Sequence, residues 1–186
     1  KDLRDAQGAA AIYRQVLEID SGNLPGLRGL ERVDEMLQDW PDLVEVLQLQ
    51  LEVVETERER VEVLLKLAAL QEEQFLKADV AAQHLEKALE IAPGEERAYV
   101  ALERCYRRLK QWFDLINTYE RHIQETAERE TKLELFGHIA QVYRDEIGDF
   151  DRAIDALQNV VDVDDTNVAA LDALSKLYEK QGDAAR

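Results

Sequence analysis

A self-similarity with a period of 72 residues constrains the fold more than any other feature of this sequence. The triplet Leu-Glu-Arg at 30–32 recurs at 102–104, and Trp-x-Asp-Leu at 40–43 recurs at 112–115. Alanine keeps the same spacing at Ala9, Ala81 and Ala153. A fixed period of this kind indicates a repeat architecture, in which each unit buries its apolar face only against its neighbours.

The period divides into two unlike stretches, of 37 and 35 residues. Complete stretches span 24–60, 61–95, 96–132 and 133–167, and half-units flank them at 1–23 and 168–186. We therefore interpret 1–186 as a single repeat array. Because both ends interrupt a repeat and Met36 is the only methionine, we expect the chain to be a segment of a longer protein.

Each stretch predicts two helices. In 133–167, apolar residues recur at helical spacing before and after Gly148 and Asp149, which end the first helix and cap the second. The chain holds only 8 Gly and 3 Pro, and no segment of useful length alternates with period two. The sequence thus predicts an all-α fold of about ten helices joined by short loops. Further N-caps are expected at Asn23, Thr56 and Asn167.

The apolar and small positions resemble the tetratricopeptide repeat. Stretch 133–167 shows the pattern, with Phe136, Ile139, Ala140 and Tyr143 in the first helix and Ala153 and Leu157 in the second. The pattern covers the whole chain, with departures such as Gln71 in place of Tyr and Asp165 in place of Pro. The resemblance implies a right-handed superhelical solenoid of antiparallel helix pairs, whose first helices line a concave face.

The 37-residue stretches depart from this pattern in a systematic way. Two positions that are small in the family hold Glu31 and Leu43 in one stretch, and Glu103 and Leu115 in the other. Because small side chains let paired helices approach closely, we expect tight and wide helix pairs to alternate. Trp40 and Trp112 stand at the helix turns of the wide pairs, and we interpret both as core residues that fill the extra space.

No constellation for catalysis or metal binding is visible in the sequence. The three histidines, His84, His122 and His138, lie in different predicted helices, and Cys105 falls at a core position of the repeat. Loop 162–166 lacks the glycine of a calcium loop, and no Gly-rich phosphate loop or Gly-x-Ser-x-Gly motif is present. We therefore predict a chain that is not an enzyme and holds no metal or cofactor.

In tetratricopeptide arrays, partner-binding residues lie on one stripe of each first helix. By register that stripe carries nine basic and eight acidic side chains here, although the whole chain has a net charge of −17. The resemblance implies ten ligand-binding residues in the concave groove: Arg28, Arg32, Arg97, Val100, Arg104, Arg107, Arg108, Gln141, Arg144 and Lys176. Four of these arginines fall in 95–110, where they predict an anion-binding surface. The alternative is that Glu62, Glu72 and Glu73 pair with them from the preceding first helix.

The leading hypothesis is a non-catalytic protein–protein interaction scaffold that binds a partner peptide or helix, with or without acidic groups, in the groove. The alternatives are a structural spacer, a self-assembly module that forms homo-oligomers through exposed solenoid ends, and a regulatory docking domain for a catalytic domain outside this segment. The net charge of −17 argues against nucleic acid, and no apolar run approaches the ~20 residues of a membrane span. A lone Cys105 and the high acidity favour a cytoplasmic location.

Overall fold

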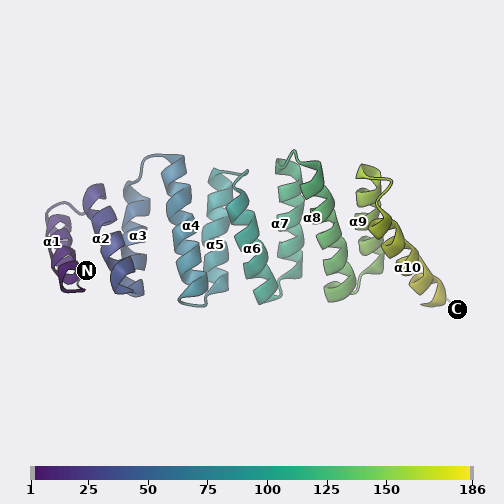
Figure 1. Cartoon of the computed structure of the whole chain (residues 1–186), viewed down its shortest axis with the longest axis horizontal. Helices are drawn as coiled ribbons and strands as arrows, with labels where there is room; N and C mark the ends of the chain where they lie inside the picture. Colours follow the sequence, from purple (N-terminus) through teal and green to yellow (C-terminus); the bar gives the residue numbers. More distant parts are fainter. Residues whose placement is uncertain (1–2, 185–186) are drawn as a thin grey trace. The chain divides into compact units, whose positions relative to one another are not determined.

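The computed structural model describes residues 3–184 of the chain. Within them ten α-helices and one short π-helical turn follow one another, and no strand is present (Figure 1). The elements are α1 (Leu3–Ile19), α2 (Leu24–Leu37), α3 (Trp40–Val53), α4 (Glu57–Glu73), α5 (Ala78–Ile91), α6 (Glu96–Leu109), α7 (Trp112–Glu125), α8 (Arg129–Gln141), η1 (Val142–Ile147), α9 (Phe150–Val163) and α10 (Val168–Ala184). The prediction of an all-α fold is confirmed.

The chain divides into two compact units, Lys1–Ala101 and Leu102–Arg186, and the division falls inside α6. Within each unit, consecutive helices joined by short loops run antiparallel (Figure 1). Because each helix has an apolar face, this arrangement buries that face against the next helix along the chain.

The predicted N-caps form at the starts of four helices. In each, a side-chain oxygen accepts a hydrogen bond from the backbone N–H three residues later: Asn23 from Gly26 (3.0 Å), Thr56 from Glu59 (3.2 Å), Asp149 from Arg152 (3.0 Å) and Asn167 from Ala170 (3.0 Å). The Thr56 hydroxyl also donates to the Glu59 carboxylate at 2.8 Å. Such caps satisfy backbone donors that the helix itself leaves unpaired, which explains why the helices begin at these residues.

The turn inside each complete stretch passes through a residue of positive φ. This angle is 56° at Gln38, Leu76 and Lys110 and 80° at Gly148. The left-handed conformation ends a helix and favours glycine, so only the last of these four turns carries a sequence signal.

A backbone hydrogen bond closes each of these turns, and its span differs between the two kinds of stretch. In the 37-residue stretches the N–H of residues 39 and 111 bonds the carbonyl five residues earlier, whereas in the 35-residue stretches the N–H of residues 77 and 149 bonds the carbonyl six residues earlier. The first helix of a 35-residue stretch therefore runs one residue further into its turn. In 133–167 the π-turn η1, which the sequence did not predict, accommodates that residue.

Small residues distinguish the tight helix pair of unit 1 from the wide one. Helices α4 and α5 pack more extensively than α2 and α3 do. The former pair places Ala68 and Ala81 at its contact positions, and Ala81 is fully buried. The latter places Glu31 and Leu43 there, as expected from the departure noted in the sequence. The larger side chains hold α2 away from α3, because a packed interior adapts to volume by separating its elements.

The buried cores follow the helix order. In unit 1, one apolar cluster centred on Leu27 and Leu30 joins α1, α2 and α3, and a second centred on Leu47 and Leu67 joins α3 and α4. In unit 2, one cluster joins helices α7, α8, η1, α9 and α10. Cys105 is fully buried, as its repeat position predicted.

Candidate interaction groove on helices α2, α3 and α4

Glu31 of α2 carries a buried carboxylate, and only 5% of the residue's surface is exposed. Gln50 Nε2 of α3 donates a hydrogen bond to Glu31 Oε2 at 2.7 Å, and Lys66 Nζ of α4 donates to Glu31 Oε1. A buried carboxylate is costly unless its oxygens are paired, and here both have partners. One side chain thus connects three helices at a position where a family member would carry a small residue.

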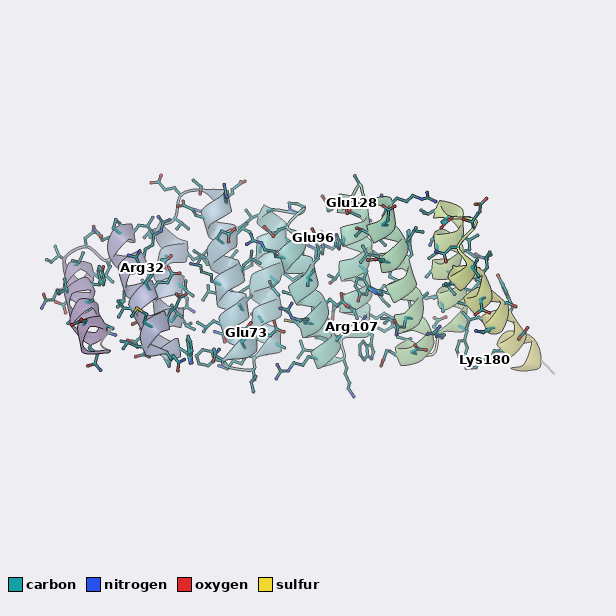
Figure 2. All side chains as sticks on the ribbon, in the orientation of Figure 1. Arg32, Glu73, Glu96, Arg107, Glu128 and Lys180 are labelled. Atoms are coloured by element: carbon teal, nitrogen blue, oxygen red, sulfur yellow. The ribbon has the colours of Figure 1, made fainter. Side chains whose placement is uncertain are left out.

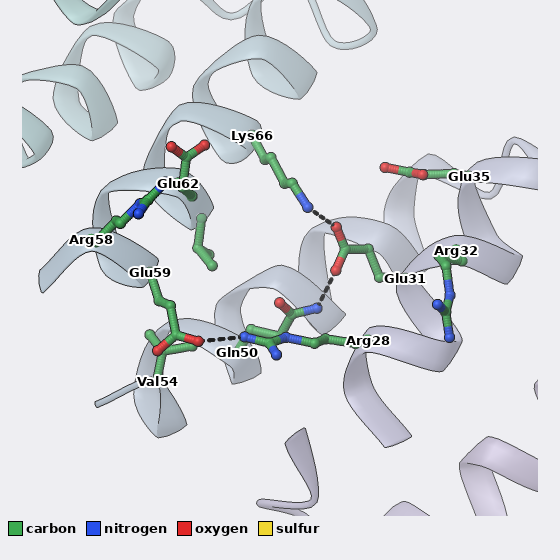
Figure 3. A pocket seen from close by; sticks show the side chains of 11 residues that line it. Arg28, Glu31, Arg32, Glu35, Gln50, Val54, Arg58, Glu59, Glu62 and Lys66 are labelled. Atoms are coloured by element: carbon green, nitrogen blue, oxygen red, sulfur yellow. Dashed lines mark hydrogen bonds and ion pairs between the residues drawn. The ribbon is translucent and has the colours of Figure 1, made fainter. Parts of the chain in front are cut away.

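Two adjoining cavities lie beside the pair formed by Glu31 and Lys66. The polar cavity, of about 430 Å³, is lined by Arg28, Glu31, Arg32, Glu35, Gln50, Val54, Arg58, Glu59, Glu62, Val63 and Lys66 (Figure 3). The apolar cavity, of about 380 Å³, is lined by Glu35, Trp40, Leu43, Leu47, Lys66, Ala69, Leu70, Glu73 and Gln74. The two cavities share Glu35 and Lys66, and together we call them the groove. All of its residues belong to unit 1.

Ion pairs engage several charged side chains around the polar cavity. Arg28 Nη2 donates to Glu59 Oε1 at 2.6 Å, and Arg97 Nη2 donates to Glu62 Oε1 at 2.6 Å. The hydrogen bond from Thr56, followed by that from Arg28, lowers the pKa of Glu59, and hydrogen bonds from Arg97 lower the pKa of Glu62. Both carboxylates are therefore ionised at neutral pH and held by an arginine.

Arg32 and Arg58 make no hydrogen bond or close ion pair with a side chain that the structure describes, although the charge of Arg58 helps to lower the pKa of the neighbouring Glu62. Arg32 extends from α2 and Arg58 from α4, so they stand on opposite sides of the polar cavity (Figure 3). An unengaged guanidinium retains its full set of five N–H donors for a ligand. Among the described cations of this cavity, Arg32 is the one without a carboxylate neighbour that these contacts identify.

The apolar cavity owes its shape to the wide helix pair. Trp40 packs beside the cluster of Leu43 and Leu47, as its predicted role as a core filler requires, and it also forms part of the cavity wall. Across the cavity, α4 presents the small side chain of Ala69, which is exposed. The space between a tryptophan and an alanine can admit a large apolar side chain from outside.

The ten residues predicted for the groove are only partly brought together. Arg28 and Arg32 line the polar cavity, and Arg97 reaches its rim through Glu62. Val100 is exposed on α6, within the same unit. The alternative considered for the arginines of 95–110, pairing with glutamates of the preceding first helix, is therefore realised at Arg97.

The remaining predicted residues belong to unit 2. Arg107, marked on α6 in Figure 2, donates from Nε to Glu103 at 2.9 Å and from Nη2 to the Tyr119 hydroxyl at 3.0 Å. Arg144 pairs with Asp145 at 2.7 Å, and Lys176 pairs with Asp172 at 2.5 Å. The others, Arg104, Arg108 and Gln141, are exposed.

Unit 2 also has a glutamate at the repeat position of Glu31, but different polar residues surround it. Glu103 stands at the register of Glu31, and its carboxylate takes part in a cluster with Arg107 and the buried Tyr119. Burial, followed by the interaction with Glu103, raises the pKa of Tyr119, so its hydroxyl stays protonated and donates. The His138 ring lies with its centroid 5.5 Å from that of Tyr119. A glutamate at this register is thus accommodated twice by neighbouring polar groups.

Sequence reasoning missed Arg58, Lys66 and Trp40 as groove residues. The signal for Arg58 was available, because it lies four residues before Glu62 and continues the same helical stripe by one turn. Lys66 lies one residue from the stripe, and it lines both cavities because its ammonium reaches across to Glu31.

Among the side chains that the structure describes, histidine, cysteine, aspartate and glutamate form no group of three that could hold a metal ion. Among the described helices, none has the length and apolar composition that crossing a membrane requires.

Comparison with known proteins agrees with the all-α helical-repeat fold. Residues 98–134 match the tetratricopeptide repeat family. The crystal structure of MamA superimposes with a TM-score of 0.55 at 19% identity, covering 89% of this chain and 92% of MamA. YrrB, described as a tetratricopeptide repeat protein with an unusual peptide-binding site, gives 0.55 at 15% identity, with 91% and 84% covered. MamA residues 41 to the end from Desulfovibrio magneticus RS-1 give 0.50 at 16% identity, with 88% and 87% covered. No curated protein matches the chain.

These findings define the class of protein as an all-α helical-repeat protein with the fold of tetratricopeptide repeat proteins. The chain has the helical-repeat fold of these proteins, and its stretch at 98–134 also matches the tetratricopeptide repeat family in sequence.

Proposed function

We propose that this chain is a non-catalytic interaction scaffold that binds a peptide or helix of a partner protein in the groove on α2, α3 and α4. The observation that carries the proposal is the pair of adjoining cavities, one polar and one apolar, above a carboxylate whose oxygens are already paired. Binding sites of this kind combine an apolar recess with a few placed polar groups. The description of YrrB as a protein with a peptide-binding site supports the same reading of this fold.

The chemistry of the groove favours recognition over catalysis. Its buried carboxylate is held by Gln50 and Lys66, and two of its more exposed glutamates, Glu59 and Glu62, are held by arginines. Groups fixed in this way supply a rigid, charged surface, whereas a general base needs an open position next to the proton that it removes.

The replacement Ala69→Trp tests this function, because it fills the apolar cavity from an exposed helix position. Peptides selected from a random displayed library on the native chain would be labelled and titrated by fluorescence anisotropy. We expect Ala69→Trp to weaken their binding at least about tenfold, since it occupies the space of a buried anchor side chain. Helical content measured by circular dichroism should not change.

The matched control is Ala127→Trp, which adds the same side chain at an exposed position in the loop between α7 and α8. It should bind the selected peptides as the native chain does. Equal affinity of Ala69→Trp and the native chain for every selected peptide would show that partners do not enter this groove.

Exposed apolar side chains favour a second candidate, self-assembly. Ile12 and Ile19 project from α1, and Val168 and Leu171 project from α10. Exposed apolar side chains can pack against the same side chains of another copy. Under this candidate the chain forms homo-oligomers or serves as a spacer through these helices, and the groove is not the interface.

A further inference from the structure

The C-terminal ends of α2 and α4 carry negative charge that the described side chains do not compensate. Glu35 lies in the last turn of α2, Glu73 is the last residue of α4, and neither helix has a basic residue in its last turn. The carboxylates of Glu35 and Glu73 make no hydrogen bond or close ion pair with a side chain that the structure describes. Because a helix C-terminus itself carries partial negative charge, a carboxylate is unfavourable there and a cation is favourable.

The same repeat positions are compensated in unit 2. Arg107 of α6 stands 72 residues after Glu35 and gives its helix a basic side chain in the last turn. Asp145 of η1 stands 72 residues after Glu73, and its carboxylate is held by Arg144 at 2.7 Å. The uncompensated charge in unit 1 is therefore a property of the residues at these two positions, and the repeat fold does not impose it.

Both carboxylates line the apolar cavity, on the opposite side chains' edges of the recess beside Trp40, and both residues are exposed. The ammonium of Lys66, the basic side chain of this lining, is engaged by Glu31. Arg32 precedes Glu35 by one helical turn, but it lines only the polar cavity, and the two side chains point apart (Figure 3). The cavity thus combines an apolar recess with an excess of negative charge.

We propose that the apolar cavity binds a helical partner segment in which a lysine or arginine accompanies a large apolar side chain. The apolar side chain packs beside Trp40, and the cation, one helical turn away from it, reaches the carboxylate of Glu35 or Glu73. This inference rests on the proposed function and adds the chemistry of the partner. The net charge of −17 attracts such a segment at long range, whereas an acidic segment would be repelled both by the whole chain and by the two carboxylates.

Three labelled peptides test this preference by fluorescence anisotropy. Each is a short alanine-rich helix with one Phe and, one helical turn away on either side, a Lys, a Gln or a Glu. The native chain should bind the Lys peptide at least about tenfold more tightly than the Gln peptide at low salt, and the Glu peptide most weakly.

A fourth peptide separates the cavity from general attraction to an acidic chain. It is the Lys peptide with Ala in place of Phe, and it should lose most of the affinity because it cannot fill the apolar recess. Equal binding of the Lys peptide with and without its Phe would overturn the inference.

The double replacement Glu35→Lys with Glu73→Lys should cancel the preference for the Lys peptide, because the local charge changes sign. Both positions are exposed and lysine is favoured at helix C-termini, so this variant should keep its helical content in circular dichroism. The control is Glu45→Lys with Glu90→Lys, which makes the same change in net charge at exposed positions of unit 1 outside the groove. This control should keep the native order.

The outcomes separate the inference from the function on which it rests. Equal binding of the Lys and Gln peptides, failure of all of them to bind, an unchanged preference in the double variant, or an equal loss in the control would overturn the selection of basic segments. The function would still stand if library-selected peptides bind and Ala69→Trp blocks them. If Ala69→Trp has no effect on any bound peptide, the groove itself is refuted.

Discussion

At the scale of single residues, Asp34 departs furthest from what its position would suggest. It lies on α2 at the register of Tyr106 and Tyr143, and it is fully buried. Neither carboxylate oxygen accepts a hydrogen bond from a described residue, and Arg14 Nη2 approaches only to 3.9 Å. That arginine of α1 is engaged more closely by Asp42 of α3, at 2.5 Å. Desolvation by burial therefore prevails over the attraction of Arg14 and raises the pKa of Asp34 to about 6.

The raised pKa has a defined effect on stability. Below the ordinary value of 3.8, Asp34 is protonated in both the folded and the unfolded chain. As the pH rises toward about 6, the unfolded chain releases its proton first, so the favourable contribution of the neutral buried acid is lost. Above this range the folded chain carries a buried charge with little compensation.

We accordingly expect Asp34→Asn to unfold at higher urea concentration than the native chain at neutral pH. The gain should be about 1–3 kcal/mol near neutrality and should shrink toward pH 4, because Asn has no charge to bury. Asp155→Asn serves as the control, since it removes the same charge from an exposed position of α9. A gain for Asp34→Asn that is the same at both pH values would contradict the shifted pKa.

At the scale of helices, the distance between the two helices of a pair organises the chain. The tight stretches carry alanine at both contact positions, and the wide stretches carry glutamate and leucine. In unit 1 this difference creates the groove, because the separation of α2 and α4 over α3 leaves room for the two cavities. The hydrogen bonds from Gln50 and Lys66 to buried Glu31 then stabilise this separation, which apolar packing alone would tend to close.

Enlarging a tight contact tests this organisation. Ala81 and Ala153 are both fully buried, so Ala81→Leu or Ala153→Leu should each lower the free energy of unfolding by about 1–3 kcal/mol through overpacking. Urea denaturation followed by circular dichroism measures the change. Ala11→Leu, at an exposed position of α1, should be nearly neutral. Full tolerance at both buried sites would mean that the repeat register is misplaced.

At the scale of the molecule, the charge distribution bears on association between copies. A net charge of −17 on a chain of 21.3 kDa makes copies repel one another, whereas the apolar side chains on α1 and α10 favour contact. At low salt, long-range repulsion opposes association. The free energy gained by burying isolated residues such as Ile12 and Leu171 is modest, because the apolar area is small.

Light scattering over a concentration series decides between the two effects. We expect the mass to stay at the monomer value of 21.3 kDa at low salt, which would favour the groove over self-assembly as the working surface. A mass that rises with concentration, and that returns to the monomer value in the double variant Ile12→Lys with Leu171→Lys, would favour self-assembly instead.

Much of the fold could be predicted because its determinants are local. The helix content follows from apolar residues at helical spacing, and the helix starts follow from caps such as Asn23 and Asp149, whose partners lie three residues away. The turns at Gln38, Leu76 and Lys110 could not be predicted, because non-glycine residues adopt positive φ there only when the packed helices require it.

The groove shows where sequence information ends. Register alone placed Arg28, Arg32 and Arg97 on one stripe, since a stripe depends only on the helical period. Tertiary structure decided that Arg97 is bound to Glu62 while Arg32 is left available, because an ion pair between helices depends on their separation and on the reach of two side chains. Around Arg32, the positions of α2, α3 and α4 depend on the contacts of Glu31, Gln50 and Lys66, residues that lie up to 35 positions apart and meet only in the folded chain.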